Sequence, residues 1–170
     1  MTVRTNRKGS AKVAVVSDTA YTIEREFGGS AAAVFRAMTE PEYVKRWWGC
    51  PDSEWLDCQA DVRPGGYWRN SMRDGGQEVS FHGWYQEVDR PHRSVHTEVY
   101  EGVTGGGPES TEPSTLITTE LTEQGGVTTL KAHVECHTPE ILGMILESGM
   151  ESGIQVAYDR LDDLLPEAEG

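Results

Sequence analysis

Hydrophobic and polar positions alternate along residues 19–27, which place Tyr21, Ile23, Arg25 and Phe27 on one side and charged or small residues on the other. A period of two residues is typical of a strand that buries one face. Two glycines follow and end the pattern. We therefore expect a half-buried strand as the first element of the folded region.

Two short helices are expected after this strand. Ser30 is a suitable N-cap for a helix over residues 31–38. Thr39 and Glu42 have the spacing of a capping box, which predicts a second helix that ends near Gly49.

From residue 54 onward, short turns rich in glycine and proline separate segments rich in β-branched and aromatic residues. Consecutive strands joined by such turns pair in antiparallel fashion, and the turns are too short for parallel crossovers. With the strand at 19–27, the pattern predicts an antiparallel sheet of six or seven strands. The further strands are expected near residues 54–60, 67–73, 77–88, 93–101, 114–122 and 127–137.

A long helix is predicted over residues 139–165. Thr138 is its expected cap, Pro139 suits the first helical position, and Pro166 is expected to end it. Such a helix is about 40 Å long and could cross the whole sheet. Spacings of three and four residues define its predicted buried face, which contains Leu142, Leu146, Gly149, Gly153, Val156, Ala157, Leu161 and Leu164.

Three glycines inside this predicted helix are unusual. Each costs roughly 1 kcal/mol relative to alanine, so Gly143, Gly149 and Gly153 oppose helix formation unless a missing side chain serves another purpose. Two explanations remain open at this point. Either the sheet approaches the helix very closely, or a cavity lies beside it.

At 170 residues the chain has the size of one domain with its own core. We expect a flexible arm over residues 1–18, one domain over 19–166 and a short tail over 167–170. The cysteines, Cys50, Cys58 and Cys136, form no CxxC pair, which is more typical of a reducing compartment than of secretion. A cytoplasmic location is the expectation.

The formal net charge of −13 argues against nucleic acid and anionic membrane surfaces as partners. The first 18 residues differ from the rest because they carry four basic residues, Arg4, Arg7, Lys8 and Lys12, against one acid, Asp18. No apolar run approaches the roughly 20 residues that a membrane-spanning helix needs. The pattern does not determine the oligomeric state, and a homodimer stays open.

Four segments in this order resemble a known family. They are residues 27–42 (FGGSAAAVFRAMTEPE), the pair Trp47 and Trp48, residues 61–68 (DVRPGGYW) and residues 82–91 (HGWYQEVDRP). Together with the order of elements, they resemble the START-like or SRPBCC superfamily, in the branch named after an activator of the ninety-kilodalton heat-shock chaperone's ATPase. The resemblance implies a helix-grip fold of the α+β class, in which a curved antiparallel sheet wraps around a long C-terminal helix and leaves an internal hydrophobic cavity. It implies no fixed catalytic set.

The candidate ligand-binding residues combine aromatic positions of the strands and short helices with one face of the long helix. For Trp48 and Trp68, lining of a pocket and plain core packing both remain open. The full set consists of Trp48, Trp68, Phe81, Tyr85, Leu146, Gly149, Gly153 and Val156.

Metal and cofactor sites are not expected. His133 and His137 share a strand face but lie about 13 Å apart, and Cys136 faces the other way as a small buried hydrophobic residue. Only a pair formed across strands, such as His82 with His96, could begin a zinc site. The glycine-rich segment 102–107 lacks the lysine and hydroxyl residues of a phosphate-binding loop.

For acid–base chemistry, the two carboxylates considered for an apolar environment are Glu120 and Glu135. No catalytic residue is assigned from the sequence. The leading hypothesis is binding, transport or sequestration of a small hydrophobic molecule. The alternatives are a cyclase or hydrolase acting on a similar molecule, and a chaperone cofactor, which predicts an exposed apolar patch on the convex side of the sheet.

Overall fold

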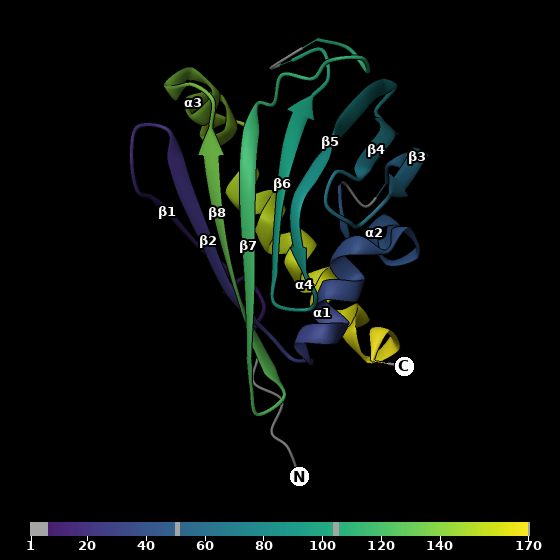
Figure 1. Ribbon diagram of the computed structural model, residues 1–170, viewed down its shortest axis with the longest axis vertical. Helices are drawn as coiled ribbons and strands as arrows, with labels where there is room; N and C mark the ends of the chain where they lie inside the picture. The colour runs from purple at the N-terminus through teal and green to yellow at the C-terminus, as the bar shows by residue number, and fades with distance from the viewer. Residues whose placement is uncertain (1–6, 50–51, 104–105, 170) are drawn as a thin grey trace.

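The computed structural model describes residues 7–49, 52–103 and 106–169. Strands dominate the chain, and helices follow the second and the last of them (Figure 1). In chain order the elements are β1 (Lys12–Val15), β2 (Ala20–Phe27), α1 (Ala31–Thr39), α2 (Pro41–Trp47), β3 (Glu54–Ala60), β4 (Tyr67–Asp74), β5 (Gln77–Asp89), β6 (Arg93–Tyr100), β7 (Thr115–Gln124), β8 (Val127–Cys136), α3 (Pro139–Glu147) and α4 (Met150–Ala168).

The strands form one antiparallel sheet in the order β1-β2-β8-β7-β6-β5-β4-β3. Strands β3 to β8 form a meander, in which the longest connection, residues 101–114, joins β6 to β7. The last strand of the meander, β8, pairs with β2. The helix α4 crosses one face of the curved sheet (Figure 1). This α+β helix-grip architecture confirms the fold class predicted from the sequence, with eight strands in place of the predicted six or seven.

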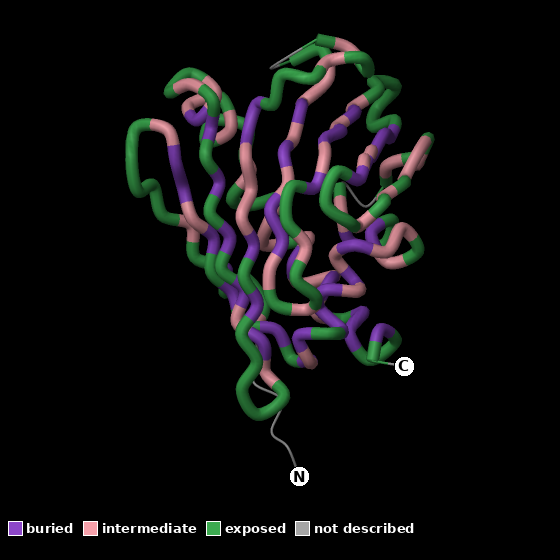
Figure 2. The backbone as a smooth tube through the Cα atoms, viewed as in Figure 1, coloured by how far each residue is buried: buried purple, intermediate pink, exposed green. Residues whose placement is uncertain are grey.

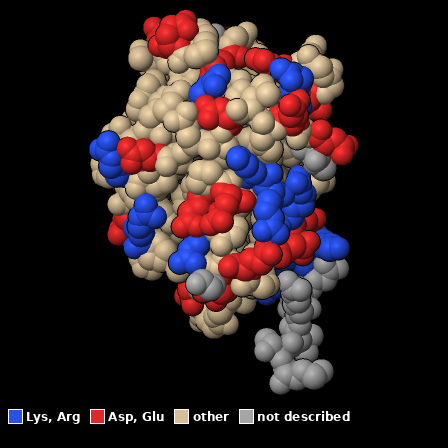
Figure 3. Space-filling view, turned by 90° about the vertical axis from the view of Figure 1, so that its right-hand side faces the viewer, with Lys and Arg blue, Asp and Glu red and all other residues tan. Residues whose placement is uncertain are grey.

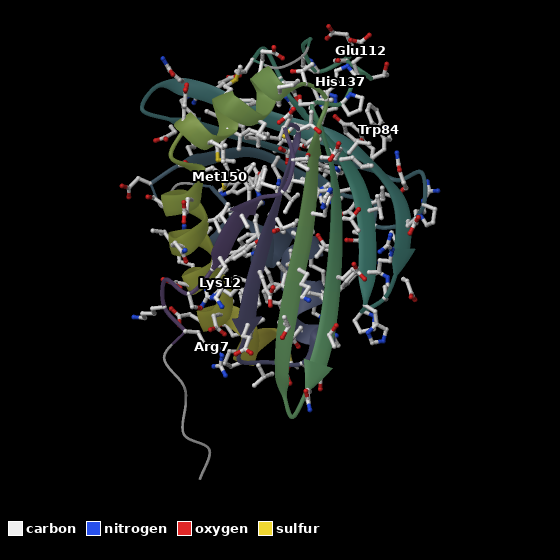
Figure 4. The ribbon with its side chains drawn as sticks, turned by 90° about the vertical axis from the view of Figure 1, so that its left-hand side faces the viewer. Arg7, Lys12, Trp84, Glu112, His137 and Met150 are labelled. Carbon is white, nitrogen blue, oxygen red and sulfur yellow. The ribbon has the colours of Figure 1, made fainter. Side chains whose placement is uncertain are left out.

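The additional strand, β1, lies within the segment 1–18 that the sequence analysis treats as a flexible arm. Its four residues pair with β2, so that Lys12 lies opposite Glu24. The backbone of Ala11 also exchanges two hydrogen bonds with the Gln155 side chain of α4, at 3.0 and 2.7 Å. Arg7 and Lys12 consequently lie beside α4 (Figure 4). The arm prediction is wrong for the strand residues, and the first six residues lie outside the described part of the chain.

The two short helices after β2 form as predicted, with one correction. Ser30 caps α1 by accepting a hydrogen bond from the Ala33 backbone at 3.1 Å. Thr39 does not cap α2, because it is the last residue of α1 and its hydroxyl donates to the Phe35 carbonyl at 2.7 Å. The N-cap of α2 is Glu40, followed by a proline at the first helical position.

The predicted single helix over 139–165 is two helices. Thr138 caps α3 as expected. Gly149, however, has a φ of +83°, a left-handed conformation that ends α3 and places the glycine at the N-cap of α4. Pro166 does not end α4, which continues to Ala168 because a proline so near the end removes only one backbone hydrogen bond.

The core lies between the concave face of the sheet and the helices α1 and α4, where buried positions cluster (Figure 2). Phe27, Leu130 and Leu161 are fully buried there. Arg25 is 2% exposed, and it joins β2 to α4 through ion pairs with Asp159 at 2.9 Å and Asp162 at 3.3 Å. The N-terminal half of α4 lies farther from the sheet core than this anchored region, as its lack of buried residues before Tyr158 indicates.

Candidate functional site

A cavity of about 570 Å³ lies on the concave side of the sheet, between its strands and the helices α1, α2 and α4. Strands β2 to β8 all contribute to its wall. Exposed residues at the end of α2, on β3 and at the α3–α4 junction also line it, including Gly49, Gln59 and Gly149. The cavity therefore reaches the surface between β3 and the junction of α3 with α4, where Met150 begins α4 (Figure 4).

Five of the eight candidate residues line this cavity. They are Trp48, Trp68, Tyr85, Gly149 and Gly153. The indole nitrogen of Trp68 donates to the Thr97 carbonyl at 3.1 Å, which leaves the ring as an apolar wall. A Cβ atom added at Gly149 or Gly153 would meet nothing within 4 Å. Close packing against the sheet therefore does not explain either glycine.

The other three candidates do not line the cavity. Phe81 packs against Trp48 and Tyr100, with ring centroids 5.1 and 4.4 Å apart. Leu146 and Val156 are 42% and 52% exposed, so their placement on the buried helix face is wrong. Because the chain breaks at Gly149, α3 and α4 do not share one axis. The predicted buried face, which assumed one continuous helix, therefore does not exist as a single surface.

His96 and Glu98 are ionisable polar residues of the cavity wall that the sequence analysis did not place there. His96 and Glu98 are two positions apart on β6, so their side chains lie on the same face of the strand, and both line the cavity. In the sequence, Val95 and Val99, which flank this pair, suggest the opposite orientation. These valines are also buried, at 5% and 0% exposure, so both faces of β6 are covered and the alternation does not reveal which face is the inner one.

The environment of Glu98 disfavours its charged form. Burial raises the pKa of its carboxyl group to about 7. No described residue donates a hydrogen bond to this carboxylate. His96 is affected in the opposite direction, since burial lowers its pKa to about 4 and keeps the ring neutral. Its Nδ1 is buried without a hydrogen-bond partner, and its ring lies 5.6 Å from the rings of Trp68 and Tyr85.

The remaining titratable groups of the wall keep their protons at neutral pH. Burial raises the pKa of Tyr85 and of Tyr158 to about 12 and that of the Cys58 thiol to about 11. Burial, together with the nearby Glu98, also raises the pKa of Tyr21. Among the described lining residues, Glu98 is therefore the group whose charge changes near neutral pH.

The other carboxylates and histidines considered from the sequence lie elsewhere. The side chains of Glu120 and Glu135 are 61% and 48% exposed, so neither is the buried acid. His82 faces away from the cavity and from His96, because it pairs with Val99 on β6. Its ring nitrogens bond to Glu101 at 2.8 Å and to the Ser110 carbonyl at 2.7 Å.

Among the described residues, no group of three metal-ligating side chains comes together. Cys136 is buried at 3% exposure, and burial raises the pKa of its thiol to about 11, which fits a structural residue. Cys50 lies outside the described residues. Within the described chain, no helix is both long and apolar enough to cross a membrane.

Comparison with known proteins agrees with this architecture. A family model described as Activator of Hsp90 ATPase homolog 1-like protein matches residues 29–166. The crystal structure of a Rhodobacter sphaeroides protein is similar with a TM-score of 0.80 and 25% identity, over 92% of this chain and 99% of that one. Protein Ms6760 from Mycobacterium smegmatis has the same fold, with a TM-score of 0.77 and 24% identity, over 92% and 97% of the two chains. No curated protein sequence matches significantly.

Proposed function

The chain belongs to the Activator of Hsp90 ATPase homolog 1-like protein family, and we propose that within this family it binds a small, largely apolar molecule in the cavity of its helix-grip fold. The function is binding, transport or sequestration. The cavity is the observation that carries this proposal, because it combines a suitable volume with an opening to the surface and apolar walls.

The size and composition of the cavity support a ligand role. Its volume of about 570 Å³ lies within the range of roughly 300–1,000 Å³ that is usual for small-molecule sites. Trp48, Trp68, Tyr85 and Tyr158 supply aromatic surface, and Ile23, Val134 and other aliphatic residues complete the wall. An unfilled space of this kind destabilises the folded protein, because the side chains that line it lose packing contacts. A protein keeps such a space when the space serves binding.

A second candidate function, a cyclase or hydrolase, is favoured by one observation. The carboxyl group of Glu98 faces the cavity with a pKa of about 7, a value suited to exchanging protons with a bound molecule. The two functions differ in what a Glu98→Gln variant would lose. A binding protein with this substitution would still bind its ligand and release it unchanged. An enzyme with this substitution would lose catalytic turnover while keeping its affinity for the substrate.

The test of the binding function uses two leucine substitutions in the C-terminal helices. Gly153 lines the cavity and Gly143 does not, and a Cβ atom at either position meets nothing within 4 Å. Uptake of the neutral fluorescent probe prodan is titrated at pH 8 for the wild type, Gly153→Leu and Gly143→Leu. We expect Gly153→Leu to weaken probe binding at least tenfold, because the added side chain occupies the cavity entrance, and Gly143→Leu to leave it unchanged.

Two results would contradict the proposal. One is the absence of saturable prodan binding by the wild type at protein concentrations up to the millimolar range. The other is equal binding by both leucine variants and the wild type, which would place the probe outside the cavity. Thermal melting of all three proteins confirms that each is folded before binding is compared.

A further inference from the structure

We infer that the cavity selects apolar molecules that carry one basic amine, whose ammonium group pairs with the carboxylate of Glu98. This inference rests on the proposed binding function and adds the chemical class of the ligand. It predicts discrimination among ligands of equal size by charge alone.

The charges around the cavity are one-sided. Among the described residues that line it, none is a lysine or an arginine, and Glu98 is the only aspartate or glutamate. Arg25 lies on the same sheet face, but its guanidinium group is held by Asp159 and Asp162 of α4. The carboxylate of Glu98 therefore has no cation of the protein within the cavity to pair with.

The elements packed around Glu98 supply no substitute for that cation. On β2 and β8 the nearby groups are Tyr21 and Cys136, whose pKa values are raised by burial and by the charge of Glu98, so both stay protonated and uncharged. On the same strand as Glu98, His96 has a pKa of about 4 and is therefore neutral above that pH. The Thr115 hydroxyl on β7 is buried without a partner. The side of α3 that packs on the core is apolar.

A ligand cation would relieve this imbalance. A buried unpaired carboxylate is costly, whereas an ion pair with good hydrogen bonds recovers much of that cost. The aromatic walls add to the preference for a cation, because the faces of Trp68, Tyr21, Tyr85 and Tyr158 attract positive charge. A ligand carboxylate, in contrast, would meet Glu98 without any lysine or arginine to neutralise it.

The experiment compares three probes that share one naphthyl ring. Naphthylethylamine, naphthylethanol and naphthylacetate are measured at pH 8 by displacement of prodan from the wild type and from Glu98→Gln. The matched control is Glu26→Gln, because Glu26 is an exposed glutamate on β2 away from the cavity. We expect the wild type and the control to bind the amine at least tenfold more tightly than the alcohol, and the acetate most weakly. Glu98→Gln should bind amine and alcohol within about threefold of each other.

The pH dependence gives a second, independent readout. An alkyl amine stays protonated across pH 5.5 to 8.5, as the lysine side chain does, so the change comes from Glu98, whose pKa is about 7. The affinity for the amine should rise by at least tenfold between these two pH values, and the affinity for the alcohol should stay flat or fall. A carbonyl ligand that accepts a hydrogen bond from the protonated carboxyl group of Glu98 would show the opposite trend.

The outcomes separate this inference from the binding function. Equal affinities for amine and alcohol in the wild type, or an amine preference that persists in Glu98→Gln, overturn the amine inference while prodan binding still supports the cavity. Failure of every probe, prodan included, overturns both. Tighter binding of the acetate than of the amine would show that the cavity charge has been assigned the wrong sign.

Discussion

The carboxyl group of Glu98 lies among apolar and aromatic side chains, and this position has a consequence for stability. Its pKa is about 7 in the folded protein, above the ordinary glutamate value of 4.5. The folded state therefore keeps this proton between about pH 4.5 and pH 7, where the unfolded chain has already lost it. The contribution of Glu98 to stability thus falls as the pH rises through this window.

A glutamine at position 98 removes this pH-dependent cost. We expect Glu98→Gln to unfold with nearly the wild-type free energy at pH 4, and to be more stable than the wild type at pH 8 by up to about 3 kcal/mol, the equivalent of the pKa difference. Urea titrations at pH 4, 6 and 8 measure the effect. The exposed Glu26→Gln control should show no such trend. A stability difference between Glu98→Gln and wild type that does not grow with pH would contradict the assignment.

At the residue scale, the sequence predicts aromatic cavity residues better than polar ones. Trp48, Trp68 and Tyr85 could be proposed because large aromatic residues beside a predicted sheet tend to become internal surface. Glu98 could not, since the buried valines of β6 occupy the opposite face and suggest an outward glutamate. When both faces of a strand are covered, buried residues occur on both of them. The alternation of hydrophobic and polar residues then no longer indicates which side chains point inward.

Among the elements, the junction between α3 and α4 departs most from the predicted single helix. Spacings of three and four residues extend across Gly149 and hide the break, because the pattern carries no information on backbone φ. In the structure Gly149 has a φ of +83°, whereas Gly153 lies inside α4 with open space around its missing side chain. The two glycines therefore serve different purposes.

Alanine substitutions distinguish these purposes by the sign of their effect. We expect Gly149→Ala to lower the free energy of unfolding by about 1–2 kcal/mol, because alanine is strained in the left-handed conformation. Gly153→Ala should raise it by about 1 kcal/mol through helix propensity, as should Gly143→Ala in α3. Urea unfolding at pH 7 measures all three. Stabilisation by Gly149→Ala would show that the break is absent in solution.

The strands of the meander could be predicted from the sequence, whereas the first strand could not. Strands β3 to β8 are joined by turns whose glycines and prolines lie next to the strands they connect, so local sequence indicates the pairing. The edge strand β1 pairs with β2, its neighbour in the chain, and Ala11 just before it bonds to Gln155, more than 140 residues away. With only four residues, Lys12–Val15 is too short for its pattern of hydrophobic positions to indicate a strand, and nothing in it indicates the contact with α4.

On the scale of the whole molecule, charge is distributed as pairs on the face that carries α2 and β3, where acidic and basic side chains are interspersed (Figure 3). Arg46 pairs with Glu167, and Arg73 with Glu54, at 2.7 and 3.1 Å. The large exposed apolar side chains among the described residues are scattered over β1, β3, α3, α4 and the chain near Val103. They form no patch on the outer faces of β2, β7 and β8, where the chaperone-cofactor alternative requires one.

The anchoring of α4 to the sheet determines whether the cavity keeps its shape. Arg25 is buried on β2 and joins two aspartates of α4, one of which also accepts a hydrogen bond from the Gly28 backbone at 2.9 Å. Removing the arginine leaves Asp159 and Asp162 facing each other without a cation. Their partial exposure, 25% and 13%, moderates the cost that a fully buried pair would incur.

We expect Arg25→Met to lower the free energy of unfolding by about 3 kcal/mol and to weaken prodan binding, since α4 forms one wall of the cavity. The matched control is Arg63→Met, because the Arg63 side chain is 67% exposed and pairs only with Asp61, two residues earlier in the same loop, among the ion pairs of the described residues. That change should cost less than about 1 kcal/mol and leave prodan binding intact. Equal losses in both variants would mean that the contact between β2 and α4 is not what holds the helix over the cavity. A stable Arg25→Met variant that binds prodan as the wild type does would assign that role to the apolar contacts of Leu161 and Leu165 alone.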